Sequence, residues 1–171
     1  MNTTRFKISA FAVFLLACGV KANAQSSASA TASATIVTPI TITKTSDMNF
    51  GNVAVQALAG GTVVMTPAGA RSATSGVTLP GTPGTVSAAS FTVNGQSGYT
   101  YSITLPAAVT ISDAASHTMT VDNFTSTPTP TGTLTGGTET LNVGATLNVA
   151  MAQTPGVYTS ATPFTVTVNY N

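Results

Sequence analysis

Residues 163–171 read PFTVTVNYN, and apolar and polar side chains alternate along this stretch. Successive side chains of a β-strand point to opposite faces, so alternation with a period of two predicts a strand with one buried face. The buried face would carry the four apolar side chains Phe164, Val166, Val168 and Tyr170. The pattern therefore predicts a half-buried strand at residues 164–170.

The same alternation recurs upstream in short runs that are separated by glycine, proline and asparagine. Thr and Val, which favour strands, dominate these runs, and no stretch has the period of an amphipathic helix. The sequence predicts an all-β fold, an immunoglobulin-like antiparallel β-sandwich of about eight to nine short strands, with a closed barrel as the alternative. The predicted strands span residues 36–43, 48–55, 62–66, 90–93, 99–105, 119–124, 139–143, 146–151 and 164–170.

Two local patterns predict turns between neighbouring strands. Asn94-Gly95 is a dipeptide that tight hairpins prefer, and it lies between two of the predicted strands. The pentapeptides TLNVG and TLNVA begin at residues 140 and 146, so Gly144 falls between two strand-like copies. We therefore predict one hairpin at 94–98 and a second one around Gly144.

The composition excludes several classes of function. Charged residues make up only 5% of the chain, with five Lys and Arg among 171 residues, so the protein cannot neutralise the phosphates of a nucleic acid. One His, four acidic residues and one Cys offer few ways to combine an acid, a base and a nucleophile. We expect no enzymatic activity, no metal site and no cofactor, and we expect His117 to be a surface residue.

Residues 1–24 have the parts of a signal peptide. Two basic residues precede an apolar run at residues 8–18, and Ala22-Asn23-Ala24 forms a small-x-small cleavage site. The run is about half of the roughly 20 residues that a spanning helix needs, so we expect export and no transmembrane segment in the mature chain. As an alternative, Leu15-Leu16-Ala17-Cys18 resembles a lipoprotein signal, in which Cys18 would be lipidated.

Residues 25–35 form a Ser- and Ala-rich leader before the predicted domain at 36–171. Two interpretations remain open. The leader is either a flexible segment, or a strand that one copy donates to the open sheet of another. In the second case the side chains of one parity would enter the neighbour, each buried carbon contributing roughly 0.8 kcal/mol. These side chains are Ala28, Ala30, Ala32, Ala34 and Ile36.

The terminal strand, with an aromatic residue next to last, resembles the C-terminal signature of pilus subunits that the chaperone-usher route assembles. That resemblance implies pairing of the strand with a periplasmic chaperone and then with the next subunit, although Gly156 lies slightly further from the end than is usual there. The blocks TPITITKTSDMNFGNVAV, FTVNGQSGYTYSITLP, GTETLNVGATLNVA and PGVYTSATPFTVTVNYN resemble the exported bacterial domain-of-unknown-function family 4402. The resemblance implies an exported, pilin-like sandwich of Gram-negative bacteria without an assigned enzymatic activity.

Two hypotheses of function follow. The first is a non-enzymatic subunit of a bacterial surface fibre, a fimbria or pilus, which associates with itself or with a periplasmic chaperone and usher. The protein would then travel from the periplasm to the cell surface. The second is a monomeric secreted or cell-surface module that binds a glycan or a protein, with a lipid anchor at Cys18 as a variant of this hypothesis.

Overall fold

The computed structural model describes residues 24–171 and divides the chain into the units Met1–Thr35 and Ile36–Asn171. Residues 24–35 are exposed and have no regular secondary structure. The predicted signal peptide, apart from Ala24, and the candidate lipidation site Cys18 lie outside the described residues. Within residues 24–171, no helix has the length and apolarity that crossing a membrane requires.

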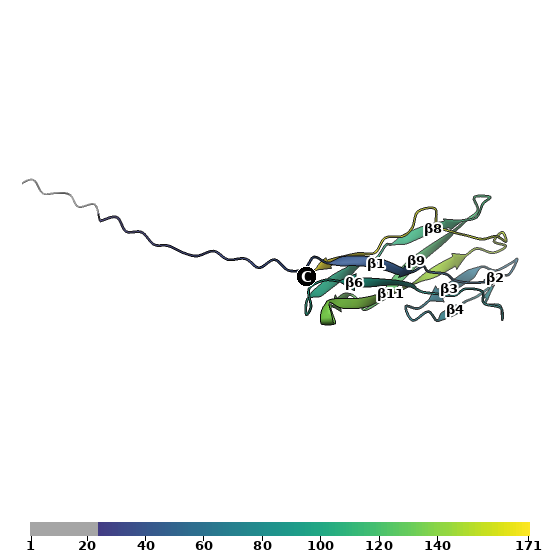
Figure 1. Cartoon of the computed structure of the whole chain (residues 1–171). Coiled ribbons are helices and arrows are strands. Elements are labelled where there is room, and N and C mark those ends of the chain that lie inside the picture. Colours follow the sequence, from purple (N-terminus) through teal and green to yellow (C-terminus); the bar gives the residue numbers. More distant parts are fainter. Residues whose placement is uncertain (1–23) are drawn as a thin grey trace, which may run out of the picture. The chain divides into compact units, whose positions relative to one another are not determined.

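The unit Ile36–Asn171 is built from twelve strands, and every recorded strand pair is antiparallel (Figure 1). The prediction of an all-β antiparallel fold is therefore confirmed. The strands are β1 (Thr41–Ser46), β2 (Ala54–Val55), β3 (Gly61–Met65), β4 (Arg71–Ala73), β5 (Val77–Thr78), β6 (Ala89–Asn94), β7 (Thr100–Thr104), β8 (Ala108–Ser112), β9 (Thr118–Thr127), β10 (Thr131–Thr133), β11 (Thr138–Val149) and β12 (Thr167–Tyr170). A short 3-10 turn, Thr135–Gly137, precedes β11.

The strands form one large and two small sheets. The seven-stranded sheet has the order β1-β6-β11-β3-β4, and β9 pairs with β11 and carries β8 on its other edge. The three-stranded sheet has the order β10-β7-β12, and β2 pairs with β5. The main core lies between the first two sheets, because Phe91, Val93 and Leu141 of the large sheet share one buried cluster with Tyr101 and Val168 of the small one. This packing of two sheets face to face makes the domain a β-sandwich.

β11 is the longest strand, and Gly144 lies in its interior, so the predicted hairpin around this residue is wrong. Residues 138–143 pair with β6, and residues 145–149 pair with β3 along the same edge. Gly144 lies at the point where the partner of β11 changes from β6 to β3. There it packs against the backbone at the end of β3 and just after it. A Cβ at this position would lie 2.6 Å from the carbonyl carbon of Thr66 and 2.8 Å from the nitrogen of Pro67. The repeated pentapeptide is therefore one continuous strand.

The hairpin predicted at Asn94-Gly95 is also wrong. β6 pairs with β1 and β11 on its two edges, so it has no free edge for the strand that follows it. The chain instead crosses to the other sheet, where it becomes β7. Two backbone hydrogen bonds stabilise this crossing. The nitrogen of Gly95 donates to the oxygen of Gly137 at 3.0 Å, and the nitrogen of Gly98 donates to the oxygen of Leu134 at 2.8 Å.

The first strand begins at Thr41 rather than at Ile36. The backbone of Thr38 does not join a sheet, because its nitrogen donates to Oε1 of Gln96 at 3.3 Å and its oxygen accepts from Oη of Tyr170 at 2.7 Å. The run predicted at 48–55 contains only the two-residue strand β2 and an isolated bridge between Asn49 and Ser87. Alternation alone predicted these strands too long at their N-terminal ends.

Candidate functional site

The predicted contact face at the C-terminus packs against the protein's own core. Val166 and Val168 are only 7% and 8% exposed, and Phe164 and Tyr170 are half-buried. The ring of Phe164 lies 5.1 Å from that of Phe124, measured between centroids. The shared face is therefore confirmed, but the regular strand comprises only Thr167–Tyr170 of the predicted run.

One edge of β12 has no strand paired with it among residues 24–171. Its other edge pairs with β7, and the nitrogen of Asn171 donates to the oxygen of Thr100 at 3.2 Å. In an antiparallel ladder, backbone groups of alternate residues face the same partner. The odd-numbered residues of β12 therefore face β7, and the backbone groups of Val168 and Tyr170 face away from it. Such a row of free N–H and C=O groups is a template for pairing with another strand.

Two features that protect edge strands, a register shift and a charged side chain, occur on β1 and not on β12. β1 has a register shift between Lys44 and Ser46, and Nζ of Lys44 lies 2.7 Å from Oδ1 of Asp47. Bulges and charged side chains both disfavour pairing with a further strand. β12 has no charged side chain, no proline and no register shift. Its open edge therefore lacks these protections, and only its length of four residues limits pairing.

Tyr170 connects this strand to the segment that enters β1. Its hydroxyl donates to the oxygen of Thr38 at 2.7 Å and accepts from the nitrogen of Gln96 at 2.5 Å. Its ring packs edge to face on Tyr99, with centroids 5.6 Å apart. A side chain at Gly95 would collide with the hydroxyl of Tyr170. Tyr170 thus has a structural function inside the domain that the alternation pattern did not predict.

The predicted donor residues are exposed and belong to no strand. Ala28, Ala30, Ala32 and Ala34 are exposed, and Ile36, at the start of the following unit, is 91% exposed. The structure thus leaves both interpretations of the leader open, as a flexible segment and as a donated strand.

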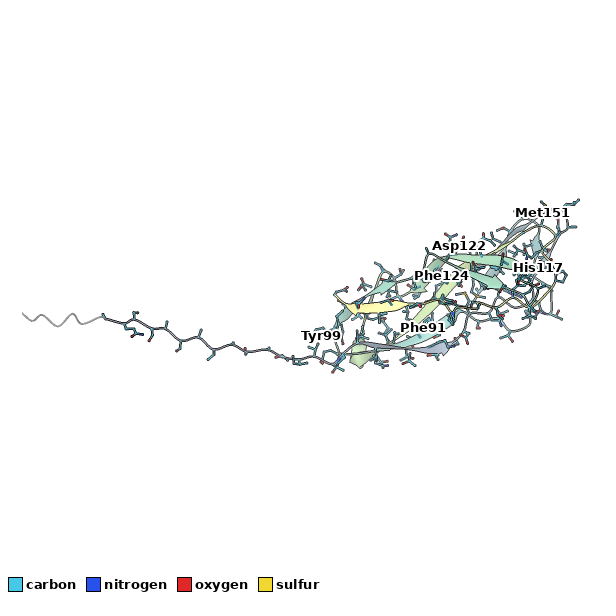
Figure 2. The ribbon with its side chains drawn as sticks, turned by 90° about the horizontal axis from the view of Figure 1, so that it is seen from above. Phe91, Tyr99, His117, Asp122, Phe124 and Met151 are labelled. Carbon is cyan, nitrogen blue, oxygen red and sulfur yellow. The ribbon has the colours of Figure 1, made fainter. Side chains whose placement is uncertain are left out.

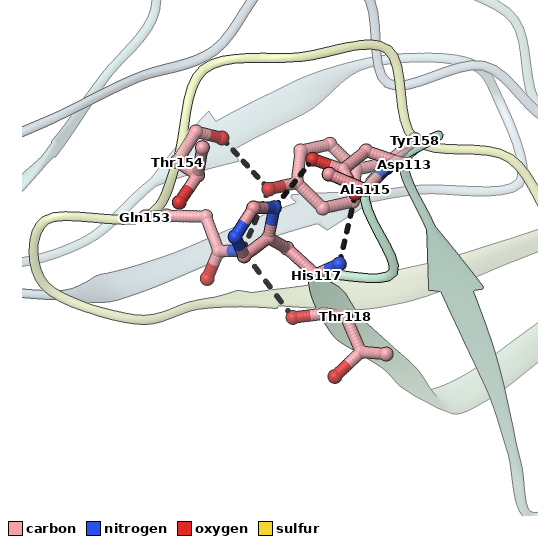
Figure 3. Close-up of polar contacts among 7 residues, drawn as sticks. All are labelled: Asp113, Ala115, His117, Thr118, Gln153, Thr154 and Tyr158. Carbon is pink, nitrogen blue, oxygen red and sulfur yellow. Dashed lines mark hydrogen bonds and ion pairs between the residues drawn. The ribbon is translucent and has the colours of Figure 1, made fainter.

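The single histidine lies in a polar cluster at the tip of the β8–β9 hairpin (Figure 3). Nδ1 of His117 lies 2.8 Å from Oδ2 of Asp113, and Oδ1 of Asp113 accepts from the backbone nitrogens of Ala115 and His117 at 2.9 and 2.8 Å. The hydrogen bond from His117, followed by those from the backbone, lowers the pKa of Asp113 below its usual value. The carboxylate therefore stays ionised and stabilises the turn, in which Ser116 has a positive φ of 68°.

The loop after β11 is attached to the same hairpin (Figure 3). Nε2 of Gln153 donates to the oxygen of Thr118 at 3.3 Å and to Oη of Tyr158 at 2.8 Å, and this hydroxyl donates to the oxygen of Thr154 at 2.7 Å. Every hydrogen bond of Asp113 joins it to the turn, which is the geometry of a loop anchor. Within residues 24–171, no three His, Cys, Asp or Glu side chains gather as a metal site would require.

Tyr101 is a second titratable residue in an unusual environment. Its side chain is fully buried, and its hydroxyl has no hydrogen-bond partner among the described residues. Glu139 lies beside it, because a Cβ at Gly132 would collide with the hydroxyl of Tyr101 and with Oε2 of Glu139 together. Burial, and then the neighbouring carboxylate, raise the pKa of Tyr101 well above its usual value.

We expect the stability of the domain to fall as the pH rises above about 10, where the phenol ionises in the unfolded chain but not in the folded one. A raised pKa in the folded state stabilises the fold below the unfolded pKa, and this contribution is lost above it, by up to about 1.4 kcal/mol per pH unit. Tyr101→Phe should remove the dependence and cost little at neutral pH, because it deletes an unpaired buried hydroxyl. Urea unfolding across this pH range measures both effects, and an equal alkaline loss in the variant would assign the dependence to another group.

The fold and these sites define a class of protein: an antiparallel β-sandwich domain with an open edge on its last strand, β12, and a polar loop anchor at the β8–β9 hairpin. The chain belongs to the family described as Domain of unknown function (DUF4402), whose model matches residues 40–170. This match confirms the family resemblance that the sequence blocks indicated. Comparison with curated proteins and with solved structures finds no match to the chain.

Proposed function

We propose that this protein is a non-enzymatic structural subunit of a bacterial surface fibre, and that it assembles by strand addition. Residues 28–36 of one copy add to the open edge of β12 in the next copy. The observation that carries the proposal is the edge of β12, whose outward backbone groups are unpaired and are not shielded by a charge, a proline or a bulge. A segment with the alternation of a strand, but without a sheet of its own, precedes the domain in the same chain.

The energetics favour backbone pairing over the filling of a groove. Val166 and Val168 are already buried, so an incoming strand meets an edge and not an exposed core. Each main-chain hydrogen bond that forms contributes about 0.5–1.5 kcal/mol, and each alanine methyl group that is buried contributes roughly 0.8 kcal/mol. Several such contacts form at each junction, and their sum sets the strength of every junction along the fibre.

The proposal includes a route to the cell surface. The basic residues, apolar run and cleavage site within residues 1–24 support export, and the resemblance of the C-terminal strand to pilus subunits supports escort by a periplasmic chaperone and usher. A chaperone that covers β12 would prevent premature strand addition, because an exposed edge strand pairs readily with other chains. Genes for an usher and a chaperone next to this gene would support this part of the proposal.

The first test compares residues 25–171 with residues 36–171 on an unheated denaturing gel. We expect a ladder of assembled species from the longer chain and a monomer from the shorter one. If both chains run only as monomers at every protein concentration tested, strand addition is contradicted.

We expect Thr167→Lys to weaken assembly strongly, because a lysine on an edge strand disfavours the approach of another strand. Thr104→Lys is the matched control, since Thr104 is the cross-strand neighbour of Thr167 and is also exposed, but belongs to the central strand β7. Size-exclusion chromatography measures assembly, and urea unfolding checks that both variants fold. Equal assembly by the two variants would show that the edge of β12 is not the acceptor.

A further inference from the structure

A pocket of about 360 Å³ lies where β9 and β11 separate. The two strands pair as far as Asn148 and Thr120 and no further, so the adjoining residues of each strand line the pocket instead of each other. Figure 2 shows His117, which directly precedes β9, at the end of the domain opposite Tyr99. The pocket is therefore remote from the junction that strand addition would use.

Two side-chain amides bond to the backbone of β9 at this point. Nδ2 of Asn148 donates to the oxygen of Thr120, and Nε2 of Gln153 donates to the oxygen of Thr118, both at 3.3 Å. Nε2 of Gln153 makes a second bond to Oη of Tyr158 at 2.8 Å. Because the nitrogen of each amide faces a carbonyl oxygen of β9, its own oxygen is directed elsewhere and is available to accept a bond.

The chemistry of the lining is neutral and polar. Two hydroxyls, from Thr118 and Thr120, and the two amides supply its polar groups, whereas the side chains of Met119 and Val149 belong to the core side of their strands, and no charged side chain lines the pocket. Amides and hydroxyls match the adjacent hydroxyl groups of a sugar, which both donate and accept hydrogen bonds. A phosphate, a carboxylate or a metal ion would find no opposite charge here.

The polar surface continues beyond the pocket across neighbouring strands. Asn148 lies opposite Thr62 of β3 on one side and Thr120 of β9 on the other, and Thr120 lies opposite Thr110 of β8. Directly opposed residues in antiparallel strands project from the same face of the sheet. These four residues therefore form a row of neutral side chains that leads out of the pocket.

We propose that this pocket binds a neutral saccharide, with further sugar units of an oligosaccharide lying along the row that extends from Asn148 to Thr110. Thr118 and Thr120 bond the sugar hydroxyls, and Asn148 and Gln153 accept through their amide oxygens. The site does not depend on strand addition, so a monomer would bind the saccharide as well as a fibre would.

The test is an array of neutral oligosaccharides, built from hexoses and N-acetylhexosamines, together with their sulfated and sialylated counterparts, probed with residues 25–171. We expect binding to neutral members, followed by titration of the best one by calorimetry. Absence of binding to every neutral member, or stronger binding to the charged counterparts, would overturn the proposal.

A matched pair of double variants locates the site. Thr118→Val with Thr120→Val removes the two hydroxyls from the pocket, and we expect at least about tenfold weaker binding. Thr138→Val with Thr140→Val makes the same change at exposed positions near the other end of β11 and should leave the affinity unchanged. Equal affinity in both double variants would overturn the assignment. Unaltered assembly of these variants would separate this result from the test of strand addition.

Discussion

We expect Ala32→Asp to abolish assembly of residues 25–171, and Ser33→Asp to leave it nearly unchanged. In an added strand, side chains of one parity face the acceptor and those of the other face solvent. Ala32 shares its parity with the alanines and the isoleucine of the leader, whereas Ser33 belongs to the polar set. On the core side of the sheet a carboxylate loses part of its hydration beside apolar side chains, and this cost exceeds what a few alanine methyl groups contribute.

The two variants have the same charge and differ by one position, so each is the control of the other. Sedimentation velocity and electron microscopy of negatively stained fibres measure assembly. If both substitutions weaken assembly equally, net charge and not strand parity is responsible, and the donor strand proposed here is wrong. If fibres form and neither substitution weakens their assembly, residues 28–36 are not the donor.

The second large effect is expected from Gly144→Ala, which should destabilise the domain by about 3 kcal/mol. The new Cβ would collide with backbone atoms of residues 65–67, and a backbone held in a sheet cannot move aside as a flexible side chain can. The collision falls where β11, which lies next to three other strands, changes partners. Urea unfolding followed by circular dichroism measures the loss.

Gly81→Ala is the matched control, because a Cβ at Gly81 would meet no atom within 4 Å. We expect this variant to be as stable as the parent or slightly more stable, since alanine restricts the unfolded chain. A loss below about 0.5 kcal/mol in Gly144→Ala would show that the strand can shift to make room, and that the close approach at Gly144 does not restrict the fold.

The candidate edge illustrates what alternation can and cannot predict. The shared face of Val166 and Val168 follows from the spacing of the residues alone, and the structure buries both. The open edge does not follow from spacing, because it depends on which strands pair with β12. Its partner β7 lies more than sixty residues earlier in the chain, and no local pattern specifies so distant a pairing. Tyr170 shows the same limit, since its hydroxyl reaches Thr38, 132 residues away.

The pocket was not predicted from the sequence, and its residues explain why. Asn148 belongs to a strand pattern in which polar residues simply alternate with apolar ones, and Gln153 lies in a loop without periodicity. The side-chain amides of Asn148 and Gln153 come together only because β9 and β11 separate at this point, where both amides bond to backbone oxygens of β9. The very short strands β4, β5 and β10 were missed for a similar reason, because two or three residues cannot display a period.

The amino-acid sequence by itself determined that the chain folds as an antiparallel all-β domain, which family it resembles, and which face of its last strand is buried. These properties depend on the order of neighbouring side chains, since the period of two is set by the geometry of the extended backbone. The tertiary structure alone decided which edges stay open, that Gly144 lies inside a strand and that the amides of Asn148 and Gln153 line a pocket. Those properties depend on contacts between residues far apart in the chain. Nearly every residue type offers the same backbone N–H and C=O groups, so many alternative strands could satisfy them, and the local sequence does not specify which one does.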